Sequence, residues 1–373
     1  MLYFLYFDNF SRFGNFMALI RKRKLTDQQT RRIEKQQQKQ RVVDDDELMD
    51  GIVIANYGKQ LEVQATSLPK RLPEKPVPIV GEPEPFWQAI TLHSIWRCHT
   101  RTNLPLIATG DKVRLSADPN TGLGRIEAIY DRKTVIFRPD RYHKLKPIAS
   151  NVDILAIVFA PLPLPSAQLI DRYLVACHTS NIKPLLILNK ADLINNNNIH
   201  ETQDLLNDYQ KLGYETLITQ SDGDLSELNR YLQQKNVIFA GQSGVGKSSL
   251  VNHLLPNVEQ SVNEISTISQ LGQHTTTTSR FLAFDPTNLS QGAVIDTPGI
   301  REYGLWHLDK DAILAGFVEL APLAGLCRFR DCKHTAHTPN CAMWQAVENG
   351  EVLARRVENL VLLQAETQTN LGS

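Results

Sequence analysis

A phosphate-binding loop in the second half of the chain constrains the fold more than any other feature. Residues 241–248 have the pattern Gly-x4-Gly-Lys-Ser. The loop follows a short apolar run at 237–240, and the residues after it favour a helix. Such a loop binds phosphates with backbone N–H groups at the start of a helix, so it needs a strand before it and a helix after it. It therefore predicts an α/β domain.

The side chains of this loop indicate how phosphates would be bound. Lys247 would neutralise oxygens of the β- and γ-phosphates, and the Ser248 hydroxyl would bind Mg²⁺. The expected phosphate-binding residues are Gly241, Gln242, Ser243, Gly244, Val245, Gly246, Lys247, Ser248 and Ser249.

A second motif that we expect near the phosphates, Asp-Thr-Pro-Gly at 296–299, follows the apolar run 293–295. It begins about fifty residues after the phosphate-binding loop. We expect Asp296 to hold the Mg²⁺ shell, largely through water, and the N–H of Gly299 to sense the γ-phosphate.

The tetrapeptide Asn-Lys-Ala-Asp at 189–192 is typical of guanine recognition. The Asp192 carboxylate can accept hydrogen bonds from guanine N1–H and N2–H₂, a donor pair that adenine lacks. We expect Lys190 to lie over the base and Asn189 to tie this loop to the phosphate-binding loop. In an ordinary GTPase the guanine motif comes last, whereas here it comes about fifty residues before the phosphate-binding loop. The order therefore predicts a circularly permuted GTPase domain.

The hydrophobic pattern around these motifs supports an α/β domain independently. Continuous apolar runs alternate with helical segments over residues 149–305, which is typical of a buried parallel sheet. The runs are 154–160, 184–188, 237–240 and 293–295. A Ser/Thr-rich turn at 219–221 follows a further strand, and we expect it to contact the base.

A threonine-rich loop at 272–278 lies between the phosphate-binding loop and the Asp-Thr-Pro-Gly motif. One of its threonines would complete the coordination of Mg²⁺ when the γ-phosphate is present, and Thr275 and Thr276 are both candidates. The expected magnesium ligands are Ser248, Asp296 and Thr276, or Thr275 in its place.

The residue after the Asp-Thr-Pro-Gly motif is Ile300, where many GTPases place a water-orienting glutamine. His274 is therefore our candidate for positioning the attacking water. The expected catalytic residues are His274, Thr275, Thr276 and Lys247. Slow unassisted hydrolysis, stimulated by a partner, is the expected consequence.

Three of the five cysteines lie within fifteen residues and predict a metal site rather than disulfides. Three thiolates and an imidazole form a complete tetrahedral set, so we expect one structural zinc per chain. The expected ligands are Cys327, Cys332, His334 and Cys341, with His337 as an alternative to His334. Cys177 and His178 are expected in the core, and Cys98 is expected to be structural or free.

The N-terminal part of the chain has a different pattern. We expect residues 1–49 to form a disordered, basic and glutamine-rich extension, with a basic arm that touches RNA as the alternative. Residues 50–148 contain short alternating runs with turn residues between them, which favour a small OB-fold barrel. A proline-rich stretch at 68–85 would be a long loop of this barrel. After the GTPase domain, residues 306–373 are expected to form a helical zinc-binding domain.

The formal net charge of the chain is zero, so any affinity for nucleic acid must be local. Residues 51–148 carry 15 lysines and arginines against 9 acidic residues. The cations gather near the end of this segment, with Phe137 and Tyr142 between them: Arg132, Lys133, Arg138, Arg141, Lys144 and Lys146. This pattern is consistent with an RNA-binding surface, and an ordinary solvated face of the barrel is the alternative.

These features together resemble the RsgA (YjeQ) family of circularly permuted GTPases over about residues 50–365. The likeness rests on the phosphate-binding loop at 241–249, on His-Thr-Thr-Thr from 274 and on Cys-Arg-Phe-Arg-Asp-Cys-Lys-His from 327. The family usually has a basic residue where this chain has Gln273. The resemblance implies an OB-fold, GTPase and zinc-domain architecture, GTP hydrolysis stimulated by the small ribosomal subunit, and contact with its rRNA.

Our first hypothesis is a GTPase that binds the small ribosomal subunit and hydrolyses GTP to GDP and phosphate as a late maturation checkpoint. The alternative is an RNA-binding module, or a translation regulator on mature ribosomes, that uses GTP as a structural or switching ligand. We expect a cytoplasmic monomer without a membrane segment.

Overall fold

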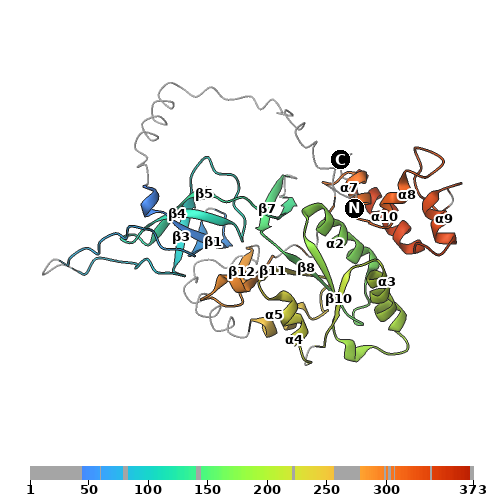
Figure 1. The fold of residues 1–373 in the computed structure, drawn as a ribbon, viewed down its shortest axis with the longest axis horizontal. Coiled ribbons are helices and arrows are strands. Elements are labelled where there is room, and N and C mark those ends of the chain that lie inside the picture. The colour runs from blue at the N-terminus through green and yellow to red at the C-terminus, as the bar shows by residue number, and fades with distance from the viewer. Residues whose placement is uncertain are drawn as a thin grey trace, which may run out of the picture. The chain divides into compact units, whose positions relative to one another are not determined.

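The computed structural model describes residues 44–369, with gaps at 59, 79–82, 140–143, 221–222, 256–277, 298–299, 301–303, 306 and 337. The chain divides into two units, Met1–Asp44 and Asp45–Ser373, and all the described helices and strands belong to the second unit (Figure 1). The extension expected over 1–49 lies outside the described residues up to position 43. Its last residues are ordered, because Asp45–Glu47 form a 3-10 turn (η1) and the first strand begins at Met49.

Five strands after this turn form a closed barrel. They are β1 (Met49–Asn56), β2 (Leu61–Ala65), β3 (Ile95–Thr100), β4 (Lys112–Asp118) and β5 (Leu123–Ile129). Their order is β1-β2-β3-β5-β4, and pairing of β4 with β1 closes the barrel. Strand β1 alternates buried and half-buried residues, so one face fills the barrel around the fully buried Trp96. This is the predicted OB-type barrel, with β3 as a strand that the sequence pattern did not reveal.

Two connections join the barrel to the central sheet. A two-stranded sheet of β6 (Val135–Pro139) and β7 (Leu145–Ser150) comes directly after the barrel strands. Barrel strand β1 also pairs with β12 (Arg280–Ala283) through Ala55 and Arg280, so the barrel strands and the central sheet form one hydrogen-bonded sheet.

The central sheet has the order β10-β9-β8-β11-β13-β12. Its other strands are β8 (Ile154–Phe159), β9 (Lys183–Leu188), β10 (Glu215–Ile218), β11 (Lys235–Ala240) and β13 (Gly292–Asp296). All neighbouring pairs are parallel except β12 with β13. Strand β8 is buried at every position, as expected for a sheet covered on both faces. The chain enters this sheet at β8 and reaches the phosphate-binding loop only at β11, in the middle of the sheet.

Helices cover the two faces of the sheet and form two separate apolar clusters. Helix α2 (Ala167–Ser180) and α3 (Leu205–Lys211) contribute to one cluster, and α4 (Ser226–Leu232) and α5 (Lys247–Leu254) contribute to the other. Short helical turns connect these elements: η2 (Ala191–Leu193), η3 (His200–Asp204) and η4 (Leu289–Gln291).

The C-terminal region is helical around a loop that contains the cysteines. Its helices are α7 (Lys310–Ala315), α8 (Ala321–Ala324), α9 (Ala342–Glu348) and α10 (Ala354–Thr369). The buried apolar residues of α10 belong to the same apolar cluster as those of α2. Among the described residues, no helix combines the length and the apolar character that crossing a membrane requires.

Candidate functional site

The phosphate-binding loop connects the carboxyl end of β11 to the start of α5, as the sequence predicts. Gly246 has φ 93°, and a Cβ there would lie 2.3 Å from Nδ2 of Asn189. Gly241 has φ 134°, and a Cβ there would lie 2.0 Å from the carbonyl oxygen of Val158. Both positions therefore need glycine, for the backbone conformation and for the close approach of neighbouring groups.

Lys247 is held inside the loop by the loop's own backbone. Its ammonium donates a hydrogen bond to the Gly241 carbonyl at 2.9 Å and another to the Gln242 carbonyl. Ser248, in the first turn of α5, is exposed. The loop thus presents a cation and a hydroxyl at the N-terminus of a helix, where phosphate oxygens are favoured.

The guanine motif meets the phosphate-binding loop at the same edge of the sheet. The buried Asn189 donates from Nδ2 to the Val245 carbonyl at 3.0 Å, and the Lys190 ammonium donates to the Gly244 carbonyl at 2.6 Å. Asp192 is exposed in η2. These two bonds link segments more than fifty residues apart in sequence, as β9 and β11 both end here.

Thr219 has a role that the sequence pattern did not reveal. Its hydroxyl donates to Oδ1 of Asn189 at 2.9 Å, and its carbonyl accepts the Ala191 N–H at 3.2 Å. The residue is buried, so its side chain orients the guanine motif, and a contact of this turn with the base stays a prediction. Ser221, in the same turn, lies outside the described residues.

Replacing Gly246 with alanine is expected to weaken the binding of both GDP and GTP by at least about tenfold. A left-handed φ costs a residue with a Cβ roughly 1–2 kcal/mol, and the new Cβ would also push Asn189 off Val245. Titration with a fluorescent GDP measures the loss. Gly244→Ala is the matched control, since φ is 84° there but the nearest atom to a Cβ is 3.6 Å away. Equal losses for the two variants would contradict the contact with Asn189.

The expected magnesium side of the site is only partly described. Asp296 is exposed at the end of β13 and lies in register with Arg280 of β12. His274, Thr275, Thr276 and Gly299 lie outside the described residues. The roles we expect for these four residues therefore stay predictions.

Four side chains of the C-terminal region converge in a single cluster: Cys327, Cys332, His334 and Cys341. Nδ1 of His334 lies 3.5–3.6 Å from the three sulfurs, and the Cys327 and Cys341 sulfurs are 3.9 Å apart. Tetrahedral zinc would separate a nitrogen and a sulfur ligand by about 3.6 Å, and two sulfur ligands by about 3.8 Å. The cluster therefore fits zinc with all four positions filled by protein, whereas His337 lies outside the described residues.

Neighbouring groups fix the geometry of this cluster. The Trp344 indole N–H donates to the His334 carbonyl at 2.8 Å, and the Ala342 N–H points at the Cys327 sulfur at 3.4 Å. Such outer contacts orient metal ligands and stabilise thiolates.

Cys98 is not part of this cluster. It is buried in the barrel, where burial raises the pKa of its thiol to about 12.

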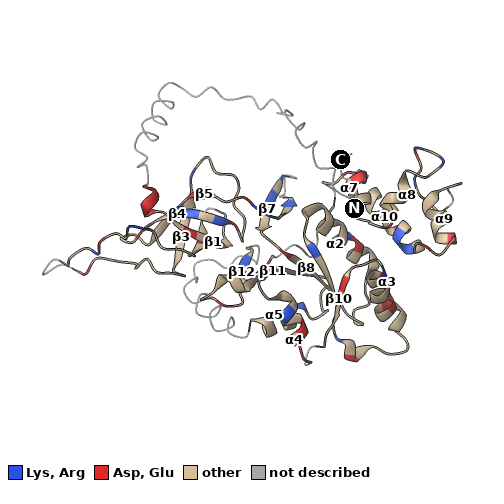
Figure 2. Cartoon of the chain, viewed as in Figure 1, with Lys and Arg blue, Asp and Glu red and all other residues tan. Residues whose placement is uncertain are grey.

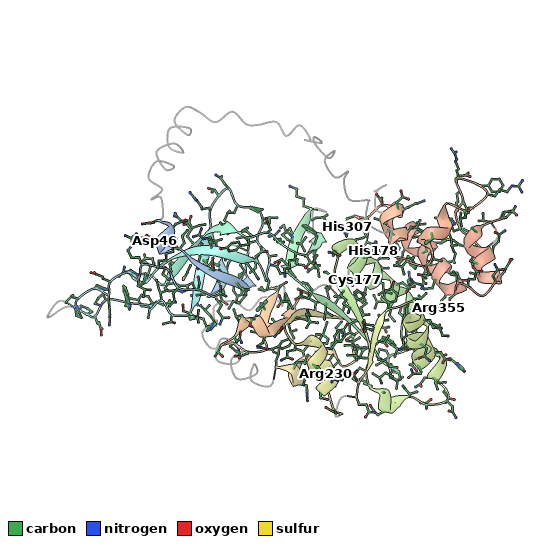
Figure 3. The ribbon with its side chains drawn as sticks, viewed as in Figure 1. Asp46, Cys177, His178, Arg230, His307 and Arg355 are labelled. Atoms are coloured by element: carbon green, nitrogen blue, oxygen red, sulfur yellow. The ribbon has the colours of Figure 1, made fainter. Side chains whose placement is uncertain are left out.

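Cys177 and His178, both labelled in Figure 3, differ in their surroundings. Cys177 is buried against the sheet, and burial raises the pKa of its thiol. His178 is exposed, so our expectation of a core position was wrong for this residue. Successive residues of a helix point about 100° apart, so a neighbour of a buried position can face solvent.

The basic residues near the end of the barrel differ in their exposure and contacts. Arg132 forms a two-bond ion pair with the buried Asp111 and therefore holds the barrel together. Arg138 on β6, Lys144 directly before β7 and Lys146 on β7 are exposed, and Figure 2 shows basic residues in this region. Arg141 and Tyr142 lie outside the described residues.

Comparisons with known proteins agree with this geometry. A family model described as RsgA GTPase matches residues 129–306. Two relatives called small ribosomal subunit biogenesis GTPase RsgA come from Pseudomonas fluorescens and Pseudomonas aeruginosa. The first is 44% identical over 322 residues, covering 86% of each chain, and the second is 43% identical over 353 residues, covering 90% of this chain and 95% of the relative.

Two solved structures resemble the fold. YjeQ from Thermotoga maritima matches with a TM-score of 0.61 and 27% identity, covering 87% of this chain and 99% of that one. YloQ, described as a circularly permuted GTPase, matches with a TM-score of 0.61 and 27% identity, covering 88% and 98%.

Proposed function

Because the chain belongs to the RsgA family of GTPases, we propose that it acts in small ribosomal subunit biogenesis and hydrolyses GTP to GDP and phosphate. The observation that carries this proposal is the hydrogen bond from Asn189 to Val245, which joins the guanine motif and the phosphate-binding loop in one site. GTP would bind across this junction, with Asp192 at the base and Lys247 at the β- and γ-phosphates.

When bound, Mg²⁺ would neutralise the negative charge that develops on the phosphates during hydrolysis. In our proposal Ser248 and Asp296 hold it, together with Thr276 or Thr275. The attacking water would be positioned by His274. Because Ile300 cannot orient water, unassisted hydrolysis should be slow and a partner should stimulate it.

Zinc would be structural in this protein. Its four ligands would be Cys327, Cys332, His334 and Cys341, and the distances within the cluster support this set. With no position left for water or substrate, the metal would stabilise the C-terminal region and take no part in hydrolysis.

The partner in this proposal is the small ribosomal subunit with its rRNA. The exposed cations of the β6–β7 sheet support a contact with RNA phosphates. We propose that the protein works as a monomer in the cytoplasm, that GTP favours docking, and that hydrolysis releases the protein. The domain limits in this proposal are 50–148, 149–305 and 306–373.

The test is GTP turnover by the full chain with and without purified small subunits. We expect stimulation of hydrolysis by small subunits and none by large subunits. An RNA-binding module that uses GTP only as a structural ligand would bind small subunits without any increase in turnover, and that result would overturn the proposal.

Asp192→Asn is expected to weaken GDP binding by about 10–100-fold, because charge-assisted hydrogen bonds to the base contribute roughly 1.5–3 kcal/mol. The asparagine amide can donate to the C2 carbonyl of xanthine, so xanthosine diphosphate should bind the variant better than GDP does. Competition titrations with both nucleotides measure this exchange. Unchanged preference for guanine would contradict the role of Asp192, and loss of both nucleotides would indicate a disrupted site.

A further inference from the structure

Helix α2 contacts the residue that follows the Asp-Thr-Pro-Gly motif. The Tyr173 hydroxyl donates a hydrogen bond to the Ile300 carbonyl at 3.2 Å. Both residues are buried, with Tyr173 only 1% exposed. Ile300 comes directly after Gly299, and its own N–H donates to the Thr297 carbonyl at 3.3 Å. A side chain of α2 therefore holds the backbone of the residue that directly follows the Asp-Thr-Pro-Gly motif.

The same turn of α2 is bonded to the C-terminal helix α10. The buried carboxylate of Asp171 accepts hydrogen bonds from Arg356 and from Nδ2 of Asn359, the latter at 2.6 Å. The next residue, Arg172, donates to Glu366 at 2.7 Å. Three successive residues of α2 thus make all of these contacts with Ile300 and α10.

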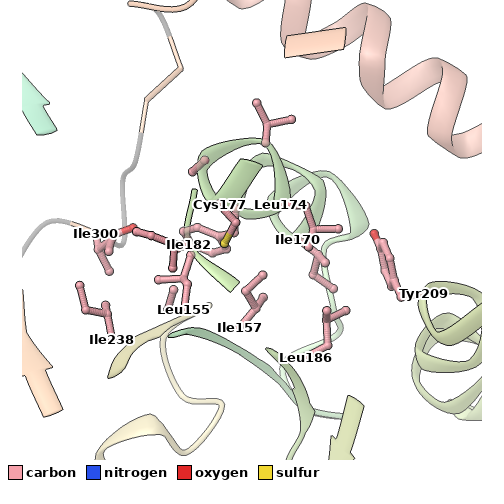
Figure 4. Packing of buried hydrophobic residues seen from close by; sticks show 14 of the residues in the cluster. Leu155, Ile157, Ile170, Leu174, Cys177, Ile182, Leu186, Tyr209, Ile238 and Ile300 are labelled. Atoms are coloured by element: carbon pink, nitrogen blue, oxygen red, sulfur yellow. The ribbon is translucent and has the colours of Figure 1, made fainter. Parts of the chain in front are cut away.

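Helix α2 contacts Ile300 through Tyr173, and it contacts Tyr209 and α10 through Asp171. Figure 4 shows Ile300 on one side of the helix and Tyr209 on the other. Tyr209 donates to Asp171 at 2.5 Å, on the side where α10 is bonded. A displacement of the Ile300 backbone would therefore act on a helix that is tied to α10 by buried polar contacts.

The surroundings of Tyr173 and Ile300 are almost wholly apolar. A small hollow with almost wholly apolar walls lies beside Tyr173 and Ile300, and its lining includes Leu155 and Cys177. Apolar contacts are not directional, so the hydrogen bond from Tyr173 adds a directional contact to the backbone of Ile300. Phenylalanine at position 173 would fill nearly the same volume without the hydrogen bond to the Ile300 carbonyl.

We propose that Tyr173 is a positioning residue for γ-phosphate recognition, and that α2 passes the state of this backbone to α10. The inference rests on the proposed binding of GTP at the phosphate-binding loop. Only GTP carries a γ-phosphate, so the contact with Ile300 should affect GTP and leave GDP unaffected. A residue that only supported the fold would affect both nucleotides equally.

The test compares Tyr173→Phe with the wild type in the full chain. We expect the affinity for a non-hydrolysable GTP analogue to fall by about fivefold, as for the loss of one hydrogen bond, and the affinity for GDP to change less than about twofold. Tyr231→Phe is the matched control, because Tyr231 packs in the apolar cluster on the other face of the sheet. An unchanged ratio of the two affinities would overturn the role of Tyr173.

Hydrogen exchange tests the second half of the proposal. In the wild type, exchange over residues 354–369 should differ between the GDP form and the GTP-analogue form, and Tyr173→Phe should reduce that difference. Equal exchange in both wild-type forms would overturn the connection to α10. These measurements need no ribosome, so they can succeed or fail independently of stimulation by small subunits.

Discussion

Replacing Arg356 with methionine is expected to lower the free energy of unfolding by about 3–5 kcal/mol, as for the loss of one partner from a buried ion pair. Arg356 is 1% exposed and makes two hydrogen bonds to Glu319, at 2.5 and 3.0 Å, and one to Asp171. Burial alone would lower the pKa of Arg356, but the hydrogen bonds with Glu319 and the charge of Asp171 raise it overall. Methionine would fill much of the space and leave the two carboxylates without their cation.

The neighbouring residue provides the control for this prediction. Arg355 pairs with Asp208 at 3.0 Å, but its side chain is 27% exposed, and Figure 3 labels it beside α3. Arg355→Met should therefore cost about 1 kcal/mol or less. Urea denaturation followed by circular dichroism compares the two variants. Similar unfolding midpoints would contradict the idea that this buried cluster fastens α10 to α2.

The buried ion pairs of Arg356 with Asp171 and Glu319 could not be predicted from the sequence. Asp171 and Arg356 are 185 residues apart, and nothing local to either marks a partner. The guanine motif and the phosphate-binding loop could be paired from sequence because each carries its own chemistry in a short pattern. Their permuted order is confirmed by the sheet, in which β11 lies between β8 and β13, and by the family to which the chain belongs.

Two features near the barrel are not visible in the sequence, for a similar reason. The sequence does not reveal strand β3, because only Trp96 and Cys98 of its six residues are buried in the barrel and this alternation is too short to recognise. The sequence places Arg132 among the cations of an expected RNA-binding surface, but it does not show the ion pair that Arg132 forms in the barrel. Its partner Asp111 lies 21 residues away and is completely buried.

The second large effect is expected for a substitution in the cluster of three cysteines and His334. Cys332→Ser is expected to reduce the zinc content from about one per chain to nearly none, because a hydroxyl is a poor ligand for zinc and the other three ligands do not complete the tetrahedron. Structural zinc sites in small domains contribute an apparent binding free energy of about 10–16 kcal/mol. The loop between α8 and α9 should therefore lose its structure, which would appear as faster hydrogen exchange over residues 325–348.

Atomic absorption and nucleotide titration together make this prediction specific. GDP affinity should be unchanged, since the four ligands all follow residue 326 and none belongs to the phosphate-binding loop. His334→Ala should lose zinc as Cys332→Ser does, whereas His337→Ala should retain it, because Nδ1 of His334 already lies 3.5–3.6 Å from all three sulfurs. Loss of zinc from His337→Ala alone would make His337 the fourth ligand. Full zinc content in Cys332→Ser would show that the metal does not depend on this cluster.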